Sequence, residues 1–365
     1  MNVIARVAPR SCRRLPEPRF DHLYDLTTLL GFWEHADHAK PRPEHGSCTD
    51  DNARGLIAIL REESDEPHLD EMEEIFTRFI QEAAISSGRF HNRRRKNGVW
   101  VDTIGSDDSQ GRPIWAFGSL LHRAAEVKTR GAAPDLFERQ TFESTSPRAN
   151  AFAVLGAREV LDAHATNAMA EDLMRSGLLT CTRSMIPTGR SPKHVLPTRI
   201  PRISETMITS GEFLGDDKMI ENGLTLLRWL LSIQKRLGHF SFTPVRGWAP
   251  GEGRPGFDQQ PNDATAMTDA CVRAWSATRE ASWLDEVMRA GEWLIGANDR
   301  RAILCDLDTF GCHDELTERG PNLNQGAEPT LASLSTLRQA KKAGLSVGPR
   351  SRCASTGVVR VGELR

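Results

Sequence analysis

The sequence has little of what marks several large classes of protein. Its 365 residues include a single tyrosine, Tyr24, and no two of its seven cysteines form a Cys-x-x-Cys pair. This spacing argues against zinc ribbons and thioredoxin-type redox motifs. No apolar run approaches the roughly 20 residues needed to cross a bilayer, so we expect no membrane insertion.

Net charge is also nearly absent. The chain has 47 Lys plus Arg against 49 Asp plus Glu, for a formal charge of −2, and its mean hydropathy is −0.44. Because a generic nucleic-acid binder carries an excess of basic charge, we expect no nucleic-acid partner. Scattered cysteines, interpreted as free thiols, and the lack of an apolar signal segment within Met1–Pro16 indicate a cytoplasmic protein.

What the chain does have is helical periodicity. Apolar residues recur at three- and four-residue spacings, with charged residues on the other face, as expected of helices on the outside of a globule. Such segments are 67–84, 168–185, 218–234 and 283–295, with a weaker one near 133–142. Residues 1–16 and 343–365 lack the pattern, so we predict a flexible N-terminal segment, a disordered C-terminal tail and a single domain over 17–342.

A second kind of helical segment alternates with the first. It has few charges and many small residues, which suggests helices buried on several sides. These segments are 52–60, 113–125, 149–160, 205–214, 264–277 and 328–340. Outer and inner helices in alternation predict an all-α protein, an (α/α)6 toroid of six helical hairpins, with a plain helical bundle as the alternative.

Short extended pieces interrupt the helices. Residues 88–92 and 98–103 are predicted to pair as a hairpin, and so are 238–242 and 245–248. We expect these hairpins to decorate the loops of the toroid, because they are too short and too few to form a central sheet.

Acids, amides and arginines cluster where the inner helices are expected to start. In a toroid the inner helices run parallel, so these side chains would converge on one mouth. Helix capping alone explains one such side chain per helix, but motifs such as Asp50-Asp51-Asn52-x-Arg54 supply several. A concave site of carboxylates and amides with tryptophan nearby suits a carbohydrate, whose hydroxyls need polar partners and whose ring faces stack on aromatic side chains.

Four motifs together resemble a bacterial family of six-hairpin, glycosidase-like proteins, which occur alone or fused to glycosyltransferase domains. The motifs are His45-Gly46-x-Cys48-x-Asp50-Asp51-Asn52-Ala53-Arg54, Ser106-x-Asp108-Ser109-x-Gly111-Arg112, Phe257-Asp258-Gln259-Gln260-Pro261 and Asn324-Gln325-Gly326-Ala327-Glu328. The similarity spans roughly residues 19–340. It implies the toroid fold, a glycan as substrate or ligand, and a glycosyltransferase as a possible partner.

The first functional hypothesis is a glycoside hydrolase acting on an oligosaccharide or bacterial glycan. It needs two carboxyl groups, which in an inverting enzyme stand about 6.5–9.5 Å apart. We predict Glu328 as the acid and Asp108 as the base, with Asp51 as the main rival. The residues predicted to bind substrate are His45, Asp50, Asn52, Arg54, Asp107, Arg112, Trp115, Trp248, Asp258, Gln259, Gln260, Asn324 and Gln325.

The alternative is a glycan-binding module, associated with a glycosyltransferase system, that holds sugar without cleaving it. Positions that depart from the family pattern, such as Asp107 and Asp263 in place of Glu, favour it. A sugar epimerase or lyase on a similar toroid would need a His or Tyr base, and Tyr24 lies far from the motifs.

A metal enzyme is a further alternative. Glu34-His35-x-Asp37-His38 and His45 are residue types that bind metals, but the stretch contains no helical His-Glu-x-x-His motif. The Asp pairs also lack the Asp-Asp-x-x-Asp pattern of magnesium-dependent isoprenoid synthases. We therefore expect no metal and no cofactor.

Overall fold

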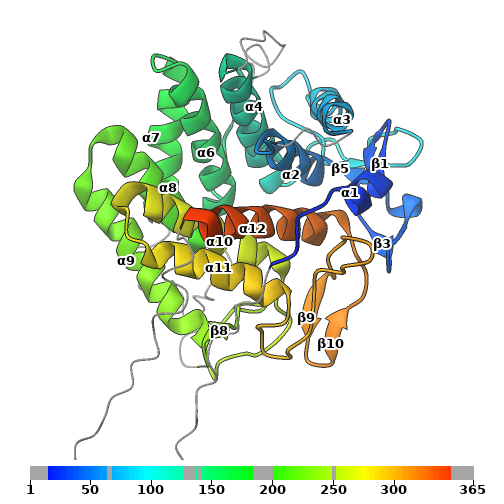
Figure 1. Cartoon of the computed structure of the whole chain (residues 1–365). Coiled ribbons are helices and arrows are strands. Elements are labelled where there is room, and N and C mark those ends of the chain that lie inside the picture. Colours follow the sequence, from blue (N-terminus) through cyan, green and yellow to red (C-terminus); the bar gives the residue numbers. More distant parts are fainter. Residues whose placement is uncertain are drawn as a thin grey trace, which may run out of the picture.

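Helices dominate the structure, a computed structural model that describes residues 15–63, 68–126, 137–138, 142–183, 200–248 and 252–346. Within these ranges there are eleven helices, and strands occur only as short antiparallel pairs (Figure 1). None of the described helices is both long enough and apolar enough to span a membrane. The predicted all-α class is confirmed.

Six helices form a closed inner ring in which each contacts the next. In chain order they are α2 (Thr49–Leu60), α4 (Asp108–Glu126), α6 (Pro147–Ala163), α8 (Ile200–Leu214), α10 (Pro261–Thr278) and α12 (Ala327–Ser346), and α12 contacts α2. Their small residues, such as Ala153, Ala157, Ala270 and Ala274, are fully or almost fully buried because helices cover them on several sides.

An outer helix packs against the inner ring at most positions. α3 (Leu69–Ala83) contacts α2, α7 (Ala168–Arg183) contacts α6, α9 (Asp217–Gln234) contacts α8, and α11 (Ser282–Leu294) contacts α10 and α12. The short α1 (Asp21–Leu26) also contacts α12. The alternating order and the closed ring make this fold the predicted (α/α)6 toroid. The weak outer helix expected near 133–142 falls mostly outside the described residues, although Phe137 and Glu138 are helical.

The inner helices begin earlier than the sequence analysis placed them. Pro147 and Pro261 occupy the first position of α6 and α10, where a missing backbone N–H costs nothing. Asp50 and Asp51 lie in the first turn of α2, where the helix dipole favours negative charge. Residues such as Asp50, Asp51 and Asp108 therefore lie on the first turns of the helices, whereas we had expected the polar motifs in the loops before the helices.

Both predicted domain boundaries need a small correction. Leu15, assigned to the flexible segment 1–16, packs against the hydrophobic core. Helix α12 continues to Ser346, and Ala343 and Gly344 are buried, so the predicted tail cannot begin at 343. Residues 1–14 and 347–365, which make up the rest of the two predicted terminal segments, lie outside the described residues.

Among the described residues, four short hairpins and one pair of strands distant in sequence decorate the loops, and none forms a central sheet, as predicted. They pair β1 (Thr27–Thr28) with β2 (Gly31–Phe32), β3 (Ala36–Asp37) with β4 (Lys40–Pro41), β5 (Ser47–Cys48) with β6 (Arg93–Arg94), β7 (Lys235–Arg236) with β8 (His239–Phe240), and β9 (Glu315–Thr317) with β10 (Gly320–Asn322).

The two predicted hairpin registers are wrong. Strand β6 pairs with the distant β5, and residues 93–95 contact 99–101 across a turn at Gly98. Strand β8 pairs with β7 across Leu237 and Gly238, which both have positive φ, at 49° and 88°. This tight turn uses the glycine that we had placed inside a strand, because glycine adopts such φ values without strain.

Helices α4 and α6 approach each other closely along a seam of glycines. A methyl group on Gly111 would collide with the carbonyl oxygen of Ala149, and one on Gly118 with that of Gly156. On Gly156 it would lie 2.5 Å from the carbonyl oxygen of Ile114. The colliding atoms belong to the backbone, so they cannot move aside as a flexible side chain would.

We expect Gly156→Ala to lower the free energy of unfolding by about 2–3 kcal/mol, as overpacking in a core does. The sign is diagnostic, since replacing glycine by alanine inside a helix is otherwise stabilising by up to about 1 kcal/mol. Urea denaturation of the variant measures the effect. Gly253→Ala serves as the control, because no atom lies within 4 Å of the added methyl group. Equal stability of the two variants would contradict the close backbone contact between α4 and α6.

Candidate functional site

A cavity of about 310 Å³ lies inside the ring, where the first turns of the inner helices meet. All six inner helices contribute to its wall. Charged groups on the wall include Arg54 from α2, Arg112 from α4, Arg148 from α6, Asp263 from α10 and Glu328 from α12. Side chains far apart in the sequence therefore meet in one polar chamber, as the parallel inner helices predict.

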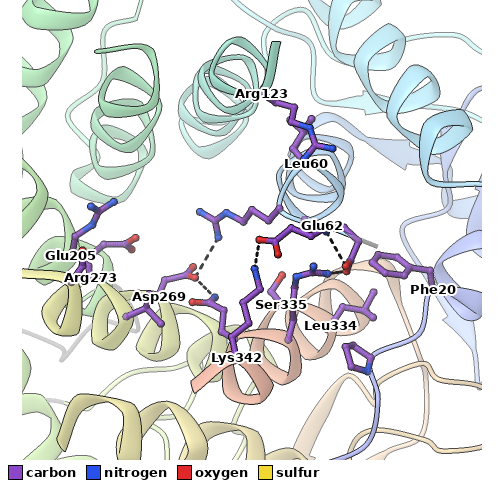
Figure 2. Close-up of a pocket in the computed structure, with 18 residues that line it drawn as sticks. Phe20, Leu60, Glu62, Arg123, Glu205, Asp269, Arg273, Leu334, Ser335 and Lys342 are labelled. Carbon is purple, nitrogen blue, oxygen red and sulfur yellow. Dashed lines mark hydrogen bonds and ion pairs between the residues drawn. The ribbon is translucent and has the colours of Figure 1, made fainter. Parts of the chain in front are cut away.

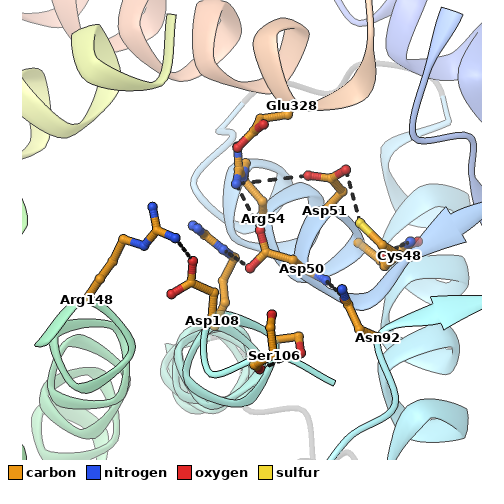
Figure 3. A network of polar contacts seen from close by, with 12 residues as sticks. Cys48, Asp50, Asp51, Arg54, Asn92, Ser106, Asp108, Arg148 and Glu328 are labelled. Carbon is orange, nitrogen blue, oxygen red and sulfur yellow. Dashed lines mark hydrogen bonds and ion pairs between the residues drawn. The ribbon is translucent and has the colours of Figure 1, made fainter. Parts of the chain in front are cut away.

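Arg54 is the centre of the polar network at this mouth (Figure 3). Its Nη1 donates to Asn262 Oδ1 at 2.8 Å and lies 2.6 Å from Glu328 Oε1, while its Nη2 donates to Asp50 Oδ2 at 3.0 Å. Arg112 Nε donates to the other oxygen of Asp50 at 2.6 Å. One buried guanidinium thus joins α2, α10 and α12.

Asp50 and Glu328 are both held in the ionised form. Burial opposes ionisation of Asp50, but Arg112 and Arg54 outweigh it and hold the pKa of this carboxyl below its usual range. Burial likewise opposes ionisation of Glu328, and Arg54 outweighs it to lower the pKa of that carboxyl. The Glu328 side chain is 44% exposed, so its carboxylate remains open to a ligand.

Asp51 behaves in the opposite way from its neighbour in sequence. Burial, with the nearby carboxylates of Glu328 and Asp50, raises the pKa of Asp51 to about 7, although Arg54 lies 4.0 Å away and acts against the shift. Cys48 Sγ donates a hydrogen bond to Asp51 Oδ2 at 3.2 Å. Asp51 therefore sits behind the cavity wall as a carboxyl that is half protonated near neutral pH.

Asp263 is the second carboxyl with a raised pKa. It lies in the first turn of α10, lines the cavity and is only 6% exposed. Burial and the negative charge of Glu328 raise the pKa of Asp263 well above its usual range, against a smaller opposing effect of Arg148. Within the described residues its Oδ2 has no hydrogen-bond partner. Asp263 and Glu328 thus offer the cavity a protonated and an ionised carboxyl.

The first turn of α4 supplies the other predicted catalytic residue. Asp108 forms an ion pair with Arg148 of α6, at the edge of the cavity (Figure 3). Asp107, next to it, is exposed, and its backbone carbonyl accepts hydrogen bonds from Gln110 and Gly111. Of this Asp pair, Asp108 is the one that takes part in the network.

A deeper layer of charge was not predicted from the sequence. Asp269 of α10 lies 2.6 Å from Arg202, accepts from Arg61 at 3.4 Å and accepts from Gln339 at 2.5 Å. Arg202 also donates to Glu205 at 2.8 Å. Burial opposes ionisation of Asp269, but Arg202 and Arg61 outweigh it and lower its pKa.

A spacing of seven residues could have revealed this layer. Arg54 and Arg61 are seven apart on α2, and their partners Asn262 and Asp269 are seven apart on α10. Seven residues are about two turns of a helix, so each pair lies on one face. The two contacts form successive bridges across the ring between α2 and α10.

A second cavity, of about 480 Å³, lies at the C-terminal ends of the inner helices (Figure 2). Its wall shares Arg61 and Asp269 with the first cavity. Most of its charges pair with each other, for example Lys342 with Glu63 at 2.7 Å. The first cavity is the better candidate site, because only there does an unpartnered buried carboxyl lie beside an ionised one.

Trp115, one of the residues predicted to bind substrate, lines the cavity, but neighbouring side chains cover its ring. It stacks on Phe152, with ring centroids 5.9 Å apart, and the guanidinium groups of Arg61 and Arg202 lie 5.1 and 5.0 Å from its centre. The Arg112 guanidinium lies 3.9 Å above the Phe152 ring. These aromatic rings orient arginines along the cavity wall.

Several predicted binding residues instead hold the loops around the mouth. Gln259 is fully buried and links Phe242 N, Asp299 and Gly256 O through its side-chain amide. Gln325 is buried and bonds Asp306 and Thr309. Their amides satisfy buried polar groups of irregular loops, a need that the sequence motif alone does not distinguish from sugar binding.

Other predicted residues lie away from the cavity wall as well. Asn52 is fully buried and donates to Cys48 O at 2.8 Å, Asn324 Oδ1 accepts from His38 N, and Trp248 Nε1 donates to Glu252 O. Asp258 and His45 are exposed. Gln260, the N-cap residue of α10, is the member of its motif that lines the cavity.

Among the described residues, two groups of side chains are of the types that bind a metal ion. In each, one ligand atom per residue lies within 4.8 Å of the others; they are Asp50, Asp51 and Glu328, and Glu34, Cys48 and Asp51. Arg54 pairs with the carboxylates of the first group, and Arg93 forms a two-bond ion pair with Glu34 of the second. In each group a guanidinium therefore already provides the positive charge that a bound metal ion would otherwise supply.

The sequence matches no known family profile and no curated protein. Solved structures do resemble the fold. A sugar epimerase from a ruminal bacterium aligns with a TM-score of 0.67 at 12% identity, covering 88% of this chain and 95% of that one. Cellobiose 2-epimerase from Spirochaeta thermophila gives 0.61 at 12% identity, covering 87% and 91%. A glycoside hydrolase family 76 mannosidase from Bacteroides thetaiotaomicron gives 0.56 at 11% identity, covering 90% and 98%.

These structures share the six-hairpin toroid with this chain over nearly the whole length of both. The expected similarity to six-hairpin, glycosidase-like proteins is confirmed at the level of the fold. At such low identity the fold alone is transferred, and the chemistry has to be argued from the cavity.

Proposed function

From this shared toroid, we propose that the protein is a glycoside hydrolase that cleaves an oligosaccharide or bacterial glycan in the cavity at the N-terminal ends of its inner helices. One observation carries the proposal. Asp263 and Glu328 line the same cavity, and their surroundings shift their pKa values in opposite directions. Glycosidic cleavage needs such a pair, one carboxyl protonated and the other ionised.

The two shifts assign the roles. Asp263 holds its proton and would donate it to the glycosidic oxygen as the bond to the anomeric carbon breaks. Glu328, ionised beside Arg54, would take a proton from the water that attacks that carbon. Glu328 had been predicted as the acid, but the neighbouring Arg54 suits it better to the base. Asp108, the base predicted from the sequence, would position Arg148.

An inverting mechanism remains part of the proposal. Inversion needs room for a water between the base and the sugar, with carboxyl groups about 6.5–9.5 Å apart. Oxygens of Asp51 and Glu328 lie within 4.8 Å of each other, too close for that arrangement. Asp51 is therefore not the partner of Glu328 in this mechanism, and it would tune the charge of Glu328 from behind.

Epimerisation is less well supported, although sugar epimerases share the fold. Removing a proton from a sugar carbon calls for a base such as His or Tyr. Among the described residues, the cavity wall contains neither type, and its titratable groups are Asp, Glu and Arg. Glycan binding without cleavage stays the alternative, and the association with a glycosyltransferase stays a prediction.

A glycan panel tests the proposal. We expect release of reducing sugar from at least one glycan, with NMR showing an inverted anomeric configuration in the first product. The rate should follow a bell-shaped pH profile, falling in acid as Glu328 is protonated and in base as Asp263 loses its proton. Binding without turnover across the panel would instead establish the non-hydrolytic module.

A further inference from the structure

The charges on the cavity wall are separated into two halves. Arginines come from four consecutive inner helices, and carboxyls come from the two that remain. The arginines are Arg54 and Arg61 of α2, Arg112 of α4, Arg148 of α6 and Arg202 of α8, and the carboxyls are Asp263 and Asp269 of α10 and Glu328 of α12. A ligand in this cavity therefore meets a cationic wall on one side and the proposed catalytic carboxyls on the other.

Two of the five arginines, Arg54 and Arg202, bond several partners each. Arg54 bonds Asp50, Asn262 and Glu328, and Arg202 lies between Asp269 and Glu205. These contacts hold the inner helices together across the ring and leave little for a ligand.

Arg112 and Arg148 retain unused donors. In the described part of the chain, Arg112 donates one hydrogen bond, from Nε to Asp50, and its two terminal nitrogens donate none. Arg148 pairs with Asp108 through Nη2 alone, and its side chain is 37% exposed. The Arg112 guanidinium lies 3.9 Å from the centre of the Phe152 ring, which holds it against the wall. Two adjacent helices thus present unsatisfied guanidinium nitrogens to one chamber.

We propose that the substrate is an acidic glycan whose anionic substituent binds Arg112 and Arg148, opposite Asp263 and Glu328. The substituent is an oxyanion on the sugar, either the carboxylate of a uronic acid or a phosphate or sulfate ester. This inference rests on the proposed function and adds the substrate class to it.

The free donors on the wall support an anion over a neutral hydroxyl. Arg112 and Arg148 each use one nitrogen, on Asp50 and on Asp108, and their remaining guanidinium nitrogens have no partner among the described residues. Both guanidinium groups line the same cavity, so one oxyanion can bond to both. Guanidinium nitrogens bond oxyanions in a planar, two-bond geometry that a single neutral hydroxyl cannot reproduce, and the oxyanion adds the attraction of opposite charges.

Matched ligands test the substrate class. The probes are oligosaccharides of several linkages ending in glucuronate, and the same oligosaccharides after reduction of the carboxyl to the neutral glucose form. Counterparts ending in glucose 6-phosphate and glucose 6-sulfate distinguish the source of the charge. Calorimetry with the full chain, with chromatography to check that the ligand stays intact, measures binding. We expect at least one charged form to bind about tenfold tighter than its neutral twin.

Variants tie that preference to the two arginines. Arg112→Gln should bring the charged and neutral affinities within about twofold of each other, as should the more exposed Arg148→Gln if the first variant folds poorly. Arg175→Gln, on the exposed face of α7, should keep the full preference.

Equal or tighter binding of the neutral forms would overturn the acidic substrate, and so would a preference that survives both variants. Hydrolysis of neutral glycans that depends on Glu328 would keep the proposed function while rejecting this inference. Failure of every probe to bind or react would reject both.

Discussion

Glu328→Gln is expected to lower the rate of glycoside hydrolysis by about 10³-fold, the range lost when a general base is removed. The amide keeps the size of the side chain but can neither take a proton from water nor carry the charge that Arg54 now stabilises at 2.6 Å. Arg54 keeps Asp50 and Asn262 as partners, so the local structure should persist. The measurement is the initial rate on the best glycan of the panel, together with a melting temperature.

The controls separate chemistry from folding. Glu318 lies in the exposed turn between β9 and β10, so the variant Glu318→Gln should leave the rate unchanged. Asp263→Asn should also lower the rate, and its loss should be smallest for substrates whose leaving group needs no protonation. An unchanged rate in Glu328→Gln would remove Glu328 from the mechanism.

Asp269→Ala is expected to lower the free energy of unfolding by about 3–5 kcal/mol, the cost of leaving a buried charge without its partner. Asp269 is 6% exposed and Arg202 is 8% exposed, and the two lie 2.6 Å apart. The variant also removes the acceptor of Arg61 and of Gln339. Chemical denaturation followed by circular dichroism provides the measurement.

A surface ion pair provides the comparison. Asp162 accepts from Arg158 at 2.8 Å one turn away on α6, and its side chain is 37% exposed. Asp162→Ala should therefore cost less than about 1 kcal/mol. If Asp269→Ala were as mild as Asp162→Ala, the deep layer would not hold the ring together.

The pH dependence of the same carboxyl has a definite sign. Because Arg202 and Arg61 hold the pKa of Asp269 below its usual value, its contribution to stability is complete above the unfolded pKa of about 4. That contribution is lost as the pH falls through the lower, folded value. The stability difference between wild type and Asp269→Ala should shrink in acid.

The architecture could be predicted because it depends on periodicity. Outer helices such as Asp217–Gln234 carry one apolar stripe, whereas inner helices such as Pro261–Thr278 have small residues on nearly every face. That contrast recurs along the chain and fixes which helices are enclosed. The convergence of Asp50, Arg112 and Glu328 followed from it, since parallel inner helices bring their first turns together.

The roles of individual side chains could not be predicted in the same way. Gln259 and Gln260 are neighbours of the same type, yet one is buried among loop hydrogen bonds and the other lines the cavity. Asp51 and Asp50 differ in pKa direction because arginines contact Asp50 more closely. Such differences arise from tertiary contacts, such as those of Asp50 with Arg112 and of Gln259 with Asp299, which the order of residues in a motif does not specify.

The glycine seam between α4 and α6 has a consequence for recognition. Gly111 meets the backbone of Ala149 directly, and each is the immediate neighbour of an arginine, Arg112 and Arg148. Because no side chain separates the two backbones here, the distance between α4 and α6 is fixed next to the residues that carry these guanidinium groups. The pair is therefore preorganised, and an anion that binds it loses little affinity to ordering the protein. A methyl group at position 111 would spread the two arginines and weaken binding without touching the ligand.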